Sequence, residues 1–163
     1  MAENGIRLVY GGGGIGLMGI VADAVLAGGG KVVGVIPDFL EARELGHRGV
    51  SRLHVVDSMH ARKNLMEQMS DAFAVLPGGF GTLDEVFEIL TWRQLLLHDK
   101  PIVLINVDGY WEPFLHLVEH IIAEGFASAE SRRLFTAVDR VEDVVAALRR
   151  APVPAVPDLP ERL

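Results

Sequence analysis

Two glycine-rich segments in this sequence have the composition of anion-binding turns. The first, residues 8–19, reads LVYGGGGIGLMG, and the second, residues 76–88, reads LPGGFGTLDEVFE. Each follows a short apolar run and precedes a helical pattern, so each is predicted to join a strand to a helix. Backbone N–H groups at a helix start bind anions, and glycine lets such groups turn toward a ligand. Both segments are therefore candidate phosphate sites.

The first segment supports anion binding more than it supports a dinucleotide. It fits G-x-G-x-x-G in two overlapping registers, beginning at Gly11 and at Gly14, and this double match makes the motif weak. It has no Gly-Lys-Ser/Thr, so it is not a nucleoside-triphosphate P-loop. Either Gly11, Gly12 and Gly13 contact an anion, or they form a tight turn that lets the helix pack closely on the sheet.

The second segment adds polar side chains to its glycines. Amides at Gly78–Thr82 could hold a phosphate, and Thr82 is predicted to cap the following helix with Glu85 as its capping-box partner. Glu85 and Glu88 share a helix face, where they could simply stabilise the helix dipole. These carboxylates would repel a phosphate bound beside them, so a phosphate site here needs a nearby cation.

Arg62 and Lys63 are the expected source of that cation. They stand with His60 in SMHARKNLM, at the start of a predicted helix, where cations oppose the helix dipole. Residues placed against a local preference suggest function, and Arg suits bidentate recognition of phosphate. The alternative is a solvated helix face. The other histidines show no metal-ligand spacing, so we expect them to be structural or exposed.

Composition excludes several classes of protein. The chain has 163 residues, 18 glycines, no cysteine and a formal net charge of −7. Disulfides and thiolate sites are absent, and a general nucleic-acid or anionic-membrane binder is disfavoured. No apolar run reaches membrane-span length and no signal peptide precedes the fold, so the cytosol is the expected compartment. We expect no metal and no cofactor, since Lys100 before a strand does not make a pyridoxal-phosphate site.

Short apolar runs alternate with helical patterns along the chain. Strands are predicted over residues 6–10, 31–36, 54–56, 72–76, 101–106 and 134–138, and helices over 17–27, 59–69, 82–97, 111–124 and 141–150. Such strands indicate an α/β fold, a Rossmann-like parallel sheet with helices on both faces. We expect one nucleotide-binding catalytic domain over residues 1–150 and a Pro-rich flexible tail over 151–163.

These motifs together resemble the LOG (Lonely Guy) family of cytokinin-activating phosphoribohydrolases. The family pattern PGGxGTxxE stands here as residues 77–85, and its MHxRK element as residues 59–63. YGGGGIGLMG, GVIP, LTWRQL and KPIVLINVDGYW are also similar to family segments, and the resemblance covers residues 5–150. Relatives have often been labelled lysine decarboxylases, a label that no residue pattern here supports.

The resemblance implies hydrolysis of the N-glycosidic bond in an N6-modified adenosine 5′-monophosphate, giving the free base and ribose 5-phosphate. It implies a catalytic pair, Arg62 and Glu85, and a homodimer. The substrate contacts that it adds are Glu44, Arg62, Lys63, Gly79, Phe80, Gly81, Thr82, Leu83, Asp84, Glu85 and Thr91. A carboxylate suits this reaction, because it stabilises an oxocarbenium-like state and orients water. A general AMP nucleosidase and a non-catalytic nucleotide-binding module are the alternatives.

The sequence also differs from the family pattern. Family members begin with another strand, a Gly-Ser-Ser-type loop and a helix before the segment that matches Ile6. The chain is therefore expected to lack the family's first strand and helix.

Overall fold

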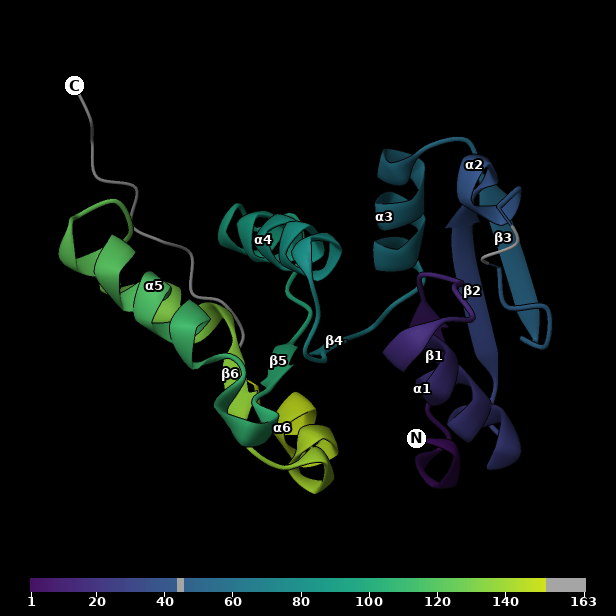
Figure 1. The fold of residues 1–163 in the computed structure, drawn as a ribbon. Helices are drawn as coiled ribbons and strands as arrows, with labels where there is room; N and C mark the ends of the chain where they lie inside the picture. The colour runs from purple at the N-terminus through teal and green to yellow at the C-terminus, as the bar shows by residue number, and fades with distance from the viewer. Residues whose placement is uncertain (44–45, 152–163) are drawn as a thin grey trace. The chain divides into compact units, whose positions relative to one another are not determined.

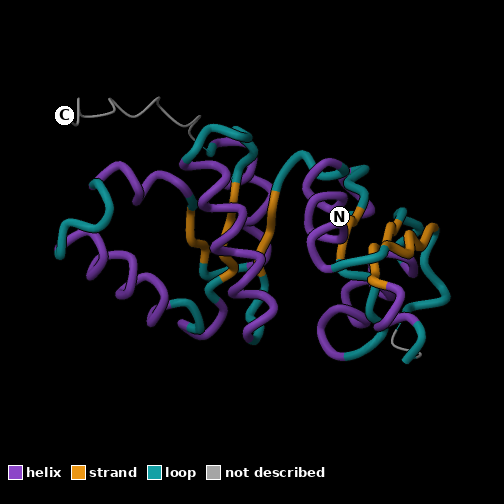
Figure 2. Tube along the Cα trace, turned by 90° about the horizontal axis from the view of Figure 1, so that it is seen from above, coloured by secondary structure: helices purple, strands orange, loops and turns teal. Residues whose placement is uncertain are grey.

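Parallel strands alternate with helices throughout the described part of the chain (Figures 1 and 2). The structure is a computed structural model, and it describes residues 1–43 and 46–151. The strands are β1 (Leu8–Tyr10), β2 (Val32–Pro37), β3 (Arg52–Val56), β4 (Phe73–Val75), β5 (Ile102–Ile105) and β6 (Thr136–Val138). The α-helices are α1 (Gly16–Ala27), α2 (Asp38–Glu41), α3 (Met59–Gln68), α4 (Phe80–Gln94), α5 (Glu112–Ala123) and α6 (Val144–Arg150). The predicted α/β class is confirmed.

The chain divides into two compact units, Met1–Ser70 and Asp71–Leu163, each with its own three-stranded parallel sheet. Residues 152–163 of the predicted tail lie outside the described residues. None of the helices in the described ranges has the length and apolar character of a membrane span.

The first unit has the strand order β1-β2-β3. Every residue of β2 is buried, as its unbroken apolar sequence VVGVIP predicts for a central parallel strand. On one side, Ala22 and Val25 of α1 pack against Tyr10 and Val32. The first glycine segment therefore follows β1, which pairs with the fully buried strand β2.

The buried face of α1 differs from the one expected. The sequence pattern favoured Leu17, Ile20, Val21, Ala24 and Val25, yet Leu17 is 49% exposed and Ile20 is 64% exposed. The residues that are buried are Gly19, Ala22 and Val25. Asp23 is the one charged residue of this helix, so apolarity alone cannot select a face. Size decides instead, because small residues let α1 approach its neighbours closely: a Cβ at Gly19 would collide with the Gly14 carbonyl.

The second unit has the strand order β4-β5-β6, and β5 is covered on both faces. Ile102 and Leu104 pack in a cluster with α4 and α5, which also holds Trp111. The alternate residues Val103 and Ile105 pack with Val144 of α6. This alternation is the period-2 pattern of a strand with apolar layers on both sides.

Tyr10 is a buried polar residue whose replacement should not destabilise the protein. Its hydroxyl has no hydrogen-bond partner among the described residues, and burial, aided by Asp23, raises its pKa from 10.0 to about 12. Tyr10→Phe removes this unsatisfied group, so we expect a free energy of unfolding at pH 8 that is unchanged or higher by about 1 kcal/mol.

The raised pKa also predicts a pH dependence. Between pH 10 and 12 the folded state keeps the Tyr10 proton that the unfolded state loses, so the stability of the wild type falls as pH rises through this window. The stability of Tyr10→Phe should not fall in this way, because the variant has no hydroxyl to titrate. Urea unfolding of both proteins at pH 8, 10 and 11 measures the difference, and a variant that is less stable at pH 8 contradicts the prediction.

Candidate active site

Arg62 packs directly against the first glycine segment. Its side chain is buried, at 8% exposure, and its Nε donates to the Val35 carbonyl of β2 at 3.2 Å. A Cβ at Gly11 would overlap the Arg62 Nη2 and come within 2.9 Å of its Cζ, so the absence of a side chain at Gly11 makes room for the guanidinium. Arg62 is therefore not on a solvated helix face. It forms, with Gly11, what we call the Gly11–Arg62 cluster.

The start of α3 holds Arg62 in this position. Ser58 is the N-cap residue, and its hydroxyl accepts from the Ala61 N–H at 3.1 Å. Lys63, the next residue, is half-buried, and His60 is exposed. Of the three basic residues predicted here, the structure buries only Arg62.

A second loop fixes the first glycine segment from the other side. The His47 N–H donates to the Gly12 carbonyl at 2.8 Å, and Gly13 forms an antiparallel bridge with Gly46. His47 Nδ1 accepts from the Gly49 N–H, so Nε2 is assigned the proton and donates to Asp23 at 2.8 Å. The structural role predicted for His47 is confirmed. Glu44, an expected substrate contact, lies outside the described residues.

The second glycine segment forms the start of α4. The helix begins at Phe80 with Gly79 as N-cap, and this glycine has no side chain with which to cap it. The predicted Thr82 N-cap is wrong: Thr82 is the third helical residue. A Cβ at Gly78 would overlap the Thr82 Oγ1, so the missing side chain lets Thr82 fold back over the turn, and the N-cap lies three residues earlier, at Gly79. A glycine N-cap supplies no side-chain acceptor to the first N–H groups of α4.

The predicted carboxylates lie in the second and third turns of α4. Glu85 and Glu88 are half-buried and share a helix face, while Asp84 is exposed. Phe80 is 92% exposed, and Leu83 packs on the core of the second unit. The Thr91 hydroxyl donates to the Phe87 carbonyl at 2.7 Å, which leaves its oxygen lone pairs free to accept. Leu83 and Thr91, which were predicted as substrate contacts, therefore also have structural roles. Leu83 packs on the core, and Thr91 forms a hydrogen bond within α4.

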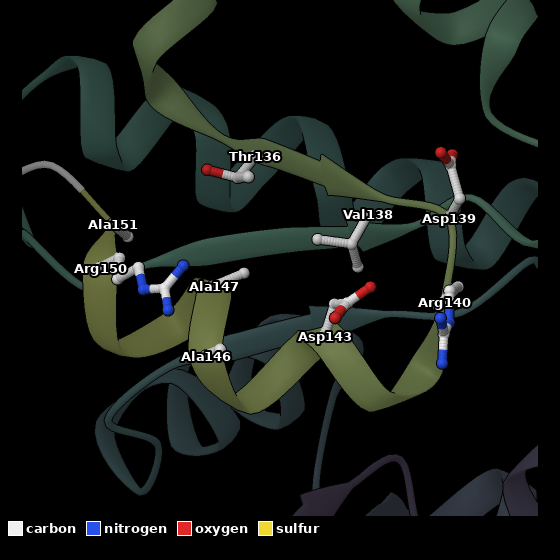
Figure 3. Close-up of a pocket in the computed structure, with 9 residues that line it drawn as sticks. All are labelled: Thr136, Val138, Asp139, Arg140, Asp143, Ala146, Ala147, Arg150 and Ala151. Atoms are coloured by element: carbon white, nitrogen blue, oxygen red, sulfur yellow. The ribbon is translucent and has the colours of Figure 1, made fainter.

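A separate open pocket lies between β6 and α6, with a volume of about 520 Å³ (Figure 3). It is lined by Thr136, Val138, Asp139, Arg140, Asp143, Ala146, Ala147, Arg150 and Ala151. None of these residues belongs to the predicted site. Across residues 1–43 and 46–151 no group of three or more His, Asp or Glu side chains could hold a metal ion.

Comparison with known proteins places the chain in a family. A family profile described as possible lysine decarboxylase matches residues 18–148. The cytokinin riboside 5′-monophosphate phosphoribohydrolase of Rhodococcoides fascians is 48% identical over 150 residues, which covers 91% of this chain and 76% of that protein. The rice enzyme of the same name, LOG, is 46% identical over 148 residues, covering 91% of this chain and 61% of that protein. The chain belongs to the LOG family.

Membership agrees with the fold. The solved structure of a molybdenum cofactor binding protein from Rippkaea orientalis matches with a TM-score of 0.65 and 21% identity, covering 91% of this chain and 78% of that one. At that identity the likeness shows a shared fold alone. The chain spans about 60% of the length of two of its rice relatives in the LOG family.

Sequence reasoning missed one residue that touches the second glycine segment. The Tyr110 hydroxyl donates to the Gly78 carbonyl at 2.6 Å. The signal was present, because the sequence Asp-Gly-Tyr-Trp begins three residues after β5 and the loops after parallel strands meet at the same sheet edge.

Proposed function

We propose that this protein hydrolyses the N-glycosidic bond of N6-modified adenosine 5′-monophosphates, releasing the free base and ribose 5-phosphate. The observation that carries the proposal is the glycine-rich start of α4, with Gly79 as N-cap and Glu85 in the second turn. Relatives at 46–48% identity that are named cytokinin riboside 5′-monophosphate phosphoribohydrolases support the same activity.

The proposed roles follow the chemistry of each group. N–H groups from Gly79 to Thr82 hold the 5′-phosphate, helped by the helix dipole. Water gives up a proton to Glu85 as its oxygen adds to C1′ of the ribose, the C1′–N9 bond breaks, and the base leaves with that proton. Glu85 orients that water and stabilises the positive charge that develops on the ribose. Each of these steps uses only the side chains and backbone of this chain.

Arg62 and Lys63 are proposed to position the substrate and offset the phosphate charge. The guanidinium is held beside Gly11, and this contact lowers the entropy cost of orienting it on binding. Gly11–Gly13 are proposed to contact the substrate beside Arg62. Glu44 and Thr91 complete the proposed contacts by family resemblance.

Turnover of a defined substrate tests the proposal. The purified chain should release isopentenyladenine from N6-isopentenyladenosine 5′-monophosphate, and its kcat/KM for this substrate should be higher than for AMP. Chromatography measures the released base. Equal values for the two substrates would favour a general AMP nucleosidase. Thermal stabilisation by the nucleotide without base release would favour a binding module.

We further propose a homodimer in the cytosol in which residues 1–150 act as one catalytic domain. The outer side of α4 and the turn after it expose apolar side chains, with Phe87 42%, Leu95 64% and Leu97 69% exposed. Such an exposed apolar surface is typical of a contact with another chain. Sedimentation velocity should give a dimer for the wild type and a monomer for Leu95→Asp/Leu97→Asp, and a monomeric wild type contradicts the proposal.

A further inference from the structure

Tyr110 lies between β5 and α5 and reaches the turn that precedes α4. Its hydroxyl donates to the Gly78 carbonyl at 2.6 Å, although the two residues are 32 positions apart in the sequence. On the basis of the function proposed above, we propose that Tyr110 is a positioning residue: it orients the glycine turn so that its amides bind the substrate phosphate.

The turn that carries Tyr110 is held rigidly. Asn106 at the end of β5 is 4% exposed, and its Oδ1 accepts from the Trp111 N–H at 2.7 Å. Its Nδ2 donates to Glu112 at 3.0 Å and to Asp139 at 3.2 Å. The Asn106 amide therefore uses both of its donors and an acceptor, and such a satisfied buried network fixes the local backbone.

Backbone and ring contacts add to this rigidity. Asp108 and Gly109 both adopt left-handed conformations, at φ 54° and 71°, which turn the chain sharply before α5. The Tyr110 ring then packs edge-to-face on the buried Trp111, with ring centroids 5.2 Å apart. The Tyr110 ring is thus held against Trp111, while 48% of the residue stays exposed.

The hydrogen bond determines where the next amide points. In a trans peptide the carbonyl and the following N–H point in opposite directions. Holding the Gly78 carbonyl toward Tyr110 therefore turns the Gly79 N–H away from Tyr110. A Cβ at Gly79 would meet no heavy atom within 4 Å, so this residue has open space around it. The Tyr110 hydroxyl thus restrains the orientation of a peptide that flexible glycines would otherwise leave free.

Tyr110→Phe tests this role, because it removes the hydroxyl and keeps the ring on Trp111. Losing one hydrogen bond of ordinary strength should raise KM for N6-isopentenyladenosine 5′-monophosphate about fivefold with kcat little changed. Calorimetry should show the same loss of affinity for ribose 5-phosphate. The inhibition constant of the free base, which has no phosphate, should stay within about twofold, and the melting temperature should not change.

Tyr10→Phe is the matched control, since it makes the same change at a hydroxyl with no described partner. It should leave KM and ribose 5-phosphate affinity unchanged. Equal effects of Tyr110→Phe on phosphate and base binding, or none on either, would overturn the positioning role. If the wild type binds ribose 5-phosphate but releases no base, the proposed hydrolase function is wrong, and calorimetry still tests the role of Tyr110. A wild type that does not bind ribose 5-phosphate overturns both.

Discussion

Glu85→Gln is expected to lower kcat for N6-isopentenyladenosine 5′-monophosphate by about a thousandfold, the middle of the range for loss of a catalytic acid or base. The substitution keeps the size of the side chain and its place in the second turn of α4, and it removes the negative charge. Glutamine cannot take a proton from water or stabilise a cationic ribose. KM should change little, because this charge acts mainly in the transition state. Steady-state kinetics with chromatographic detection of the base gives both values.

Glu88→Gln provides the control for that result. Glu88 lies one turn further on the same face of α4, is half-buried like Glu85, and would undergo the same chemical change. It should keep kcat within about threefold, since it is farther from the helix start. Similar losses in both variants would indicate a general effect of α4 charge. A Glu85→Gln protein with more than a tenth of wild-type activity would remove Glu85 from the catalytic role.

Strands and helix ends that are marked by their own residue types could be predicted from the sequence. The all-apolar runs of β2 and β5 predicted central strands buried on both faces, and both strands are. Gly28 ends α1, as glycines after an apolar helix predict. Ser58 before Met59 is a local start signal, and α3 begins there. In each case the residue types of the element itself carry the signal.

Features that depend on how closely a glycine lets neighbouring atoms approach were not predictable from the pattern. The buried face of α1 depends on Gly19 meeting Gly14, and the start of α4 depends on Thr82 folding over Gly78. Hydrophobic periodicity contains no information on either contact. The capping-box pattern at Thr82 was a sound local signal, but the glycines before it allowed the helix to begin earlier.

The candidate site divides in the same way. The glycine segments, Arg62 and Glu85 could be predicted, because their residue types stand at or near predicted helix starts. The burial of Arg62 is not visible, because a cation at a helix start is usually solvated and only the missing side chain at Gly11 admits its guanidinium. Tyr110 is less visible still, since its link to Gly78 crosses 32 residues. Sequence reasoning therefore did not find the contacts that position Arg62 and the second glycine segment.

Gly11→Ala is the second prediction with a large effect, because it places a methyl group where the Arg62 guanidinium lies. Either the arginine or the loop must move, so we expect stability to fall by about 1–3 kcal/mol, as for other overpacked sites. Displacing a substrate-positioning arginine should also lower kcat/KM about a hundredfold. Urea unfolding and steady-state kinetics measure the two effects. Gly14→Ala is the control in the same loop: its Cβ would lie 3.7 Å from His47, an ordinary contact, so both losses should be small.

A double-mutant cycle separates the packing effect from the catalytic one. If Gly11→Ala acts by collision with Arg62, its cost in stability should largely disappear in an Arg62→Ala background, where the space is empty. Activity should not return, because the guanidinium is absent. Additive losses of stability in Gly11→Ala/Arg62→Ala would mean that the methyl group collides with something other than Arg62. Full activity of Arg62→Ala alone would mean that the buried guanidinium serves the fold and not the substrate. The cycle thus tests whether Gly11 is glycine to make room for Arg62, or only to form a tight turn.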